Sequence, residues 1–138
     1  MNPVIPIIPL LQAAGVVQLA IVAANVVLPR KLSASEQLAR LSPILRQVFI
    51  VHWVFIVLVV IIFAVLSVFF APDLAGMSLL GTVLSVCLAA FWLLRVAIQV
   101  FVYDAEIRRQ HPLGNFLMTA ACAFLAAVFT LAALGALR

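Results

Sequence analysis

The sequence predicts an all-α fold, an integral membrane four-helix bundle formed by one domain over residues 1–138. The chain is 68% hydrophobic and 9% charged, whereas a soluble domain is about half apolar and about a quarter charged. A soluble globule with so few charges would expose apolar patches large enough to aggregate. Four apolar stretches reach the length of about 20 residues that a membrane-spanning helix needs. The lipid bilayer is therefore the expected surrounding of this chain.

The four predicted spans cover residues 9–28, 48–70, 79–103 and 113–137. In hydrocarbon the backbone must satisfy its own hydrogen bonds, so such runs form helices even where Val and Ile are abundant. The first stretch is expected to stay as a span rather than act as a cleaved signal peptide. Its Lys and Arg residues follow the apolar run, whereas a signal peptide carries them in front.

The connection between the first two spans has a helical pattern of its own, over residues 34–42. Ser33 and Glu36 have the spacing of a capping box, and leucines recur at helical steps behind them. This pattern predicts a short amphipathic helix in the headgroup region, and a plain polar loop is the alternative. Ser42 and Pro43 are predicted as the N-cap and first residue of the following span.

The basic residues predict an orientation. The connection between the first two spans holds four basic residues: Arg30, Lys31, Arg40 and Arg46. The connection between the last two spans holds Arg108 and Arg109, whereas the middle connection, Ala71–Ser78, holds none. By the positive-inside rule the two basic connections face the cytoplasm, so both termini lie outside. If the source is a bacterium, the membrane that holds these spans is expected to be the inner membrane.

Several function classes are not expected. The net charge is +4, but no basic stripe is present that would follow a nucleic-acid backbone. The two cysteines stand alone and the two histidines lack metal-site spacing, so neither a cofactor nor a metal is predicted. The polar residues 103–112 include carboxylates, guanidinium groups and an imidazole, but no nucleophile has a partner. The chain is therefore not predicted to be an enzyme.

Arg95 is the most informative residue of the sequence. It lies eight residues before Tyr103, so it is about 12 Å inside the predicted boundary. An arginine near the bilayer midplane costs about 2.5–3.5 kcal/mol. No Asp or Glu lies within a span, and Gln99, four residues on, is a hydrogen-bonding neighbour. The sequence leaves four possible partners for the Arg95 guanidinium group: a lipid phosphate, an anionic substrate, backbone carbonyls or an acidic residue of another subunit. A structural or partner role is favoured over a transported or reacting ligand.

A polar stripe surrounds Arg95 at three- and four-residue steps and is predicted to face inward: Ser85, Leu88, Trp92, Arg95, Gln99 and Glu106. The fourth span adds Asn115, Thr119 and Cys122 near the same depth. Gly81 with Ser85, and Ala20 with Ala24, have the spacing of closely packed helices. His52 is expected to be a hydrogen-bonded residue near the interface. The predicted contacts to a ligand or partner are Arg95, Gln99, His52 and Trp92.

The pattern Arg95-x-x-x-Gln99, Tyr103-Asp104 and Arg108-Arg109-x-His111-Pro112, with Arg46-Gln47 and His52, covers about a quarter of the chain. Through these residues the sequence resembles small four-span bacterial integral membrane proteins that are uncharacterised. The resemblance implies the four-span fold and no activity. The chain differs from small multidrug exporters, because its first span lacks their membrane glutamate.

Two functions are compatible with these observations. The first is a non-catalytic role through homo-oligomerisation or as a subunit of a membrane complex, which the small-residue faces and Arg95 favour. The second is a transporter or channel for a small anion or an amphipathic molecule, with Arg95, Gln99 and His52 along the route. A membrane enzyme acting on lipid is less favoured than both.

Overall fold

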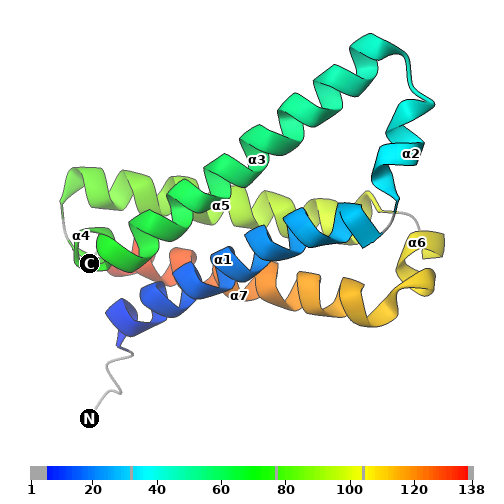
Figure 1. Cartoon of the computed structure of the whole chain (residues 1–138). Helices are drawn as coiled ribbons and strands as arrows, with labels where there is room; N and C mark the ends of the chain where they lie inside the picture. Colours follow the sequence, from blue (N-terminus) through cyan, green and yellow to red (C-terminus); the bar gives the residue numbers. More distant parts are fainter. Residues whose placement is uncertain (1–5, 32, 77, 104, 137–138) are drawn as a thin grey trace.

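The computed structural model describes residues 6–31, 33–76, 78–103 and 105–136, and the described chain is helical throughout its regular structure (Figure 1). The long helices are α1 (Ile7–Lys31), α3 (Pro43–Phe69), α5 (Leu79–Phe101) and α7 (Pro112–Ala136). The short ones are α2 (Ala34–Ala39), α4 (Ala71–Ala75) and α6 (Ala105–Gln110). Each long helix is long and apolar enough to cross a membrane. The chain is a multi-pass membrane protein with an all-α bundle, as predicted.

The helix ends differ from the predicted span ends. Helix α1 continues through Pro29 to Lys31, α3 begins at Pro43, and α5 ends at Phe101. An apolar run marks the thickness of the hydrocarbon layer, whereas a helix can continue into the headgroup region, where water also satisfies its backbone. The last residue of the fourth predicted span, residue 137, lies outside the described residues.

Helix α2 begins at Ala34 as predicted, but it ends at Ala39, three residues before the predicted end, and its N-terminus lacks the predicted side-chain cap. Ser33 has left-handed backbone angles (φ 51°, ψ 39°), and its side chain makes no capping hydrogen bond. A capping serine needs extended backbone angles, so the predicted capping box is wrong. The carbonyl of Ser33 instead accepts hydrogen bonds from the backbone N–H groups of Glu36 and Gln37. Ser42 and Pro43 do stand at the N-cap and first position of α3, without a side-chain cap.

The long helices form two antiparallel hairpins. Helix α1 packs against α3 and α5 against α7, while contacts between α1 and α7 join the two pairs. The buried core contains Leu11, Trp92, Leu125 and Phe129. Helix α3 belongs to this bundle only in its second half. Its first half, residues 43–56, leaves the bundle at an angle, and each of its residues is largely exposed (Figure 1).

Gly15 sets the distance between α1 and α3. A Cβ at this position would lie 2.5 Å from Val68 Cγ2 and 3.1 Å from the Ala64 carbonyl. One turn further, the Ser67 hydroxyl donates to Gln18 Oε1 at 3.2 Å and lies 2.7 Å from the Phe63 carbonyl. The close backbone approach therefore brings buried polar groups of the two helices together.

Helix α4 is held against the first turns of α5. The Ser85 hydroxyl donates to the Leu74 carbonyl at 2.9 Å, and a Cβ at Gly81 would clash with the Asp73 carbonyl. Ser78 caps α5, because its Oγ accepts a hydrogen bond from the Gly81 N–H at 3.0 Å. The predicted pair of small residues, Gly81 and Ser85, thus packs against α4 of the same chain.

We expect Gly15→Ala to lower the free energy of unfolding by about 1–3 kcal/mol, because the added methyl must force α1 and α3 apart. Gly135→Ala is the control, since a Cβ there meets no atom within 4 Å. Unfolding by SDS in mixed micelles, followed by circular dichroism, measures both. Equal stability of the two variants would contradict the close approach at Gly15.

Candidate functional site

Arg95 lies about two turns before the end of α5 and is half-buried. Its Nη1 donates a hydrogen bond to Gln99 Oε1 at 2.8 Å. The centre of its guanidinium group is 5.7 Å from the centroid of the Tyr103 ring, which is a cation–π distance. Both partners lie toward the C-terminal end of α5. The side chain therefore extends toward the C-terminal end of α5, against the direction in which helix side chains normally lean.

Gln99 extends this contact to the neighbouring helix. Its Nε2 donates to Asn115 Oδ1 on α7 at 2.7 Å, and the Gln99 side chain is buried. The Thr119 hydroxyl donates to the Asn115 carbonyl at 2.8 Å. Arg95, Gln99, Asn115 and Tyr103 together form what we call the Arg95 network. The network joins α5 to α7 with a row of polar contacts at the edge of the bundle.

The partners of Arg95 in this network are neutral. An amide oxygen and an aromatic ring stabilise the guanidinium group, but neither compensates its charge. A guanidinium group has five N–H donors in a planar fork, so this arrangement suits the positioning of a positive charge or the binding of an anion. The network also lacks a nucleophile next to a base, which acyl or phosphoryl transfer requires. Among the described residues, no group of three or more His, Cys, Asp or Glu is placed to hold a metal.

The structure separates the other two predicted site residues from the network. His52 is exposed on α3, and its Nδ1 lies 2.9 Å from the Val48 carbonyl of the same helix. Trp92 is buried in the core, and its indole N–H has no hydrogen-bond partner among the described residues. The ring of Trp92 instead packs edge-to-face on Phe91. Neither residue shares a hydrogen bond with Arg95 or Gln99.

The predicted inward stripe is correct for α5 but does not continue beyond it. Ser85, Leu88, Trp92 and Gln99 are buried, and Arg95 is half-buried. Glu106 is exposed on α6, a separate helix. Helix α5 ends before α6 begins, so the helical spacing that included Glu106 in the stripe no longer applies.

A second polar contact, between α1 and α3, is absent from the sequence-based predictions. The Trp53 indole N–H donates to the Asn25 carbonyl at 3.1 Å. This carbonyl would normally accept from the N–H four residues later, but that residue is Pro29, which has none. The indole of α3 therefore satisfies a carbonyl that a proline within α1 leaves open. In the sequence, the proline four residues after Asn25 indicates that the Asn25 carbonyl lacks its usual helical donor. It does not identify which residue replaces that donor.

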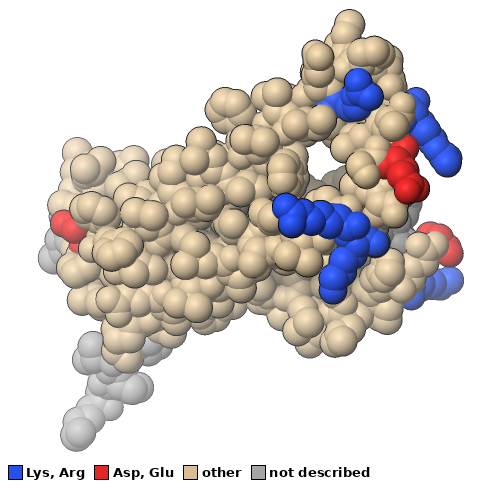
Figure 2. Space-filling model, in the orientation of Figure 1, with Lys and Arg blue, Asp and Glu red and all other residues tan. Residues whose placement is uncertain are grey.

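Beside this contact, α1, α2 and the departing half of α3 enclose a cavity of about 670 Å³, which we call the basic-end groove. Its lining residues are Pro29, Arg30, Ala34, Ser35, Gln37, Leu38, Leu41, Phe49, Ile50 and Trp53. Figure 2 shows an opening at this end of the molecule, with Lys and Arg side chains around it and acidic side-chain atoms beside it. The groove therefore combines an apolar interior with a basic rim.

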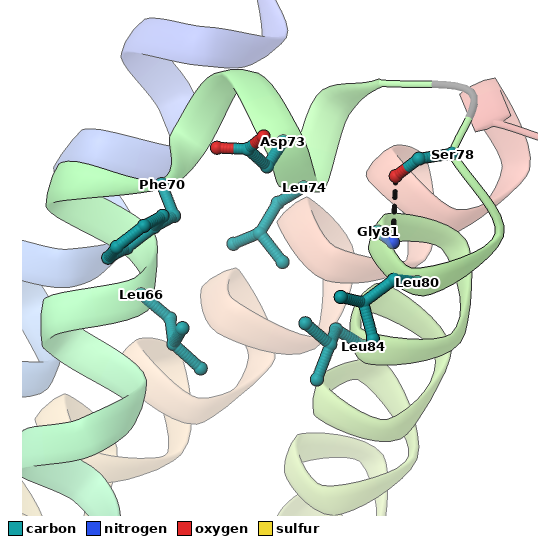
Figure 3. Close-up of a pocket in the computed structure, with 8 residues that line it drawn as sticks. All are labelled: Leu66, Phe70, Asp73, Leu74, Ser78, Leu80, Gly81 and Leu84. Carbon is teal, nitrogen blue, oxygen red and sulfur yellow. Dashed lines mark hydrogen bonds between the residues drawn. The ribbon is translucent and has the colours of Figure 1, made fainter.

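A smaller cavity, of about 390 Å³, lies at the opposite end between α3, α4 and α5 (Figure 3). It is lined by Leu66, Phe70, Asp73, Leu74, Ser78, Leu80, Gly81 and Leu84. Ser78 is engaged in capping α5, as the dashed line in Figure 3 marks. Asp73 is thus the one charged residue of a lining that is otherwise mainly leucine and phenylalanine.

Comparison with models of protein families, with curated proteins and with solved structures finds no match for this chain. Its functional interpretation therefore depends on the arrangement of its own residues.

We expect a double-mutant cycle of Gln99→Leu and Asn115→Leu to show a coupling energy of about 0.5–2 kcal/mol, the range of hydrogen bonds between membrane helices. Gln99→Leu with Thr130→Val is the control cycle, because the Thr130 hydroxyl donates to Ala126 on its own helix. SDS titration measures the unfolding free energies. Additive effects in the first cycle would show that the amide pair does not connect α5 and α7.

Trp53→Phe should lower the free energy of unfolding by about 1–3 kcal/mol, because it leaves the Asn25 carbonyl without a donor. In a Pro29→Ala background the cost should fall, since the substituted alanine restores the helical N–H for that carbonyl. The same titration compares the native chain, the two single variants and the double variant. An unchanged cost of Trp53→Phe after Pro29→Ala would exclude the proposed reason for the contact.

Proposed function

We propose that this protein acts without catalysis, by association of two copies in the membrane through α7. The supporting observation is a row of three exposed alanines at three- and four-residue steps: Ala120, Ala123 and Ala127. In lipid, helices associate by close van der Waals packing rather than by a hydrophobic driving force, so small residues mark association surfaces. A large side chain would normally face lipid at such positions, as Leu131 and Leu134 do further along the same helix.

The contacts within the chain leave this alanine row free. The opposite face of α7 carries Cys122, Leu125 and Phe129, which are buried in the core. The other small-residue pairs are less suited to association. Gly81 and Ser85 are occupied by α4, and Ala24 is half-buried beside the exposed Ala20. The alanine row of α7 is thus a small-residue surface that faces outward.

The Arg95 network supports a structural role for its residues in this function. Arg95 has an amide and an aromatic partner close to its own helix, and Gln99 links them to α7. The network therefore stabilises the helix that carries the alanine row. A transport route for a small anion past Arg95 and His52 has less support, because His52 lies exposed on α3 and shares no hydrogen bond with the network.

The charge distribution supports the orientation inferred from the sequence. Arg30, Lys31, Arg40 and Arg46 are exposed at the end of the bundle near α2, whereas α4, which carries Asp73, lies at the other end (Figures 1 and 2). Under the positive-inside rule the basic end faces the cytoplasm. Both termini then lie on the outer side of a bacterial inner membrane.

We expect Ala123→Ile to weaken self-association about tenfold or more, because the branched side chain separates the two α7 helices. Ala90→Ile, at an exposed alanine of α5, is the matched control and should leave association unchanged. Energy transfer between donor- and acceptor-labelled chains in liposomes at graded protein-to-lipid ratios measures the effect. The proposal fails if the native chain stays monomeric, or if both variants associate like the native chain.

A further inference from the structure

We propose that the basic-end groove binds one anionic phospholipid, with its phosphate at Arg30 and an acyl chain between α1 and α3. This site is separate from the α7 surface and from the Arg95 network. Three features support the proposal: the shape of the cavity, the fixed position of one of its walls and the charge around its rim.

The lining of the groove contains both apolar and polar residues. Phe49, Ile50 and Trp53 of α3 form one apolar wall, and Leu38 and Leu41 extend it along the α2 segment. Arg30, Ser35 and Gln37 contribute the polar groups. A volume of about 670 Å³ lies within the range of sites for small ligands. A phospholipid, with its acyl chains and charged headgroup, combines apolar and polar parts in the same way.

The groove is built into the fold. Because the Trp53 indole is hydrogen-bonded to the Asn25 carbonyl at 3.1 Å, α1 and α3 are joined at the point from which they diverge. Beyond it, each of the residues 43–52 of α3 is largely exposed. The space between the helices is therefore open to surrounding lipid without any movement of the chain. An acyl chain would fill it without breaking a protein contact.

The charge at the rim selects an anionic headgroup. Residues 30–46 contain four basic residues and a single acidic one, Glu36. Arg30 lines the groove itself, and a guanidinium group can bind a phosphate with two parallel hydrogen bonds. Lys31 next to it is exposed and adds to the positive potential. A free phosphate ion would use the rim but would leave the apolar walls unfilled, so a phospholipid fits the whole groove better.

Tryptophan fluorescence provides a direct test. Trp53 is 39% exposed and lines the groove, whereas Trp92 is 2% exposed and lies in the core. The protein is placed in phosphatidylcholine vesicles in which phosphatidylglycerol or phosphatidylcholine, brominated on the acyl chains, replaces a graded share of lipid. We expect half-maximal quenching at a mole fraction of brominated phosphatidylglycerol about fivefold lower than that of brominated phosphatidylcholine. Trp53→Phe should remove most of the quenching and so assign the signal.

Arg30→Gln should abolish the preference for phosphatidylglycerol, while Arg46→Gln, at an exposed arginine outside the lining, should retain it. Ala34→Leu, which fills part of the groove, should reduce the quenching by both lipids. Native mass spectrometry after mild extraction gives an independent readout, with phosphatidylglycerol retained by the native chain and lost from Arg30→Gln. Equal quenching by the two lipids, or a preference that survives Arg30→Gln, overturns the proposal. Retention of free phosphate without lipid, or the absence of any retained lipid, also overturns it.

Discussion

Hydrocarbon offers no partner to a polar group, and this constraint explains most of the specific contacts of the bundle. A backbone carbonyl that a proline or a helix end leaves open within the hydrocarbon needs a donor from the chain. The Asn25 carbonyl finds it in the Trp53 indole, and the Leu74 carbonyl in the Ser85 hydroxyl. These bonds join α1 to α3 and α4 to α5. The polar residues of this chain are few, and their positions therefore determine which helices meet.

The same constraint leaves the apolar residues free to face outward. In water the exposed Val, Ile and Phe of α3 would require a cover, whereas in lipid they are already in a favourable solvent. Helix α3 can therefore leave the bundle in its first half at little cost. What holds its second half is the close approach at Gly15 and the bond between Ser67 and Gln18. The result is a bundle that is tight at one end and open at the other.

The sequence predicts the parts of this structure that depend on composition and on neighbours along one helix. The four spans follow from apolar length, and the contact between Arg95 and Gln99 follows from their four-residue spacing. Helix ends and the cap at Ser33 were predicted less well, because local backbone angles decide them. Asn115 and Trp53 meet partners on other helices, 16 and 28 residues away in sequence. Spacing along one helix contains no information about such pairs.

The contact between Trp53 and Asn25 has a consequence for biogenesis. During insertion, the first helix alone would enter the bilayer with an open carbonyl beside Pro29, in a medium without water to hydrate it. The carbonyl is satisfied only when the second long helix arrives beside it. The first two spans are thus expected to enter the lipid as a paired unit rather than one after the other. Pro29 would thereby make the stable insertion of α1 depend on the presence of α3.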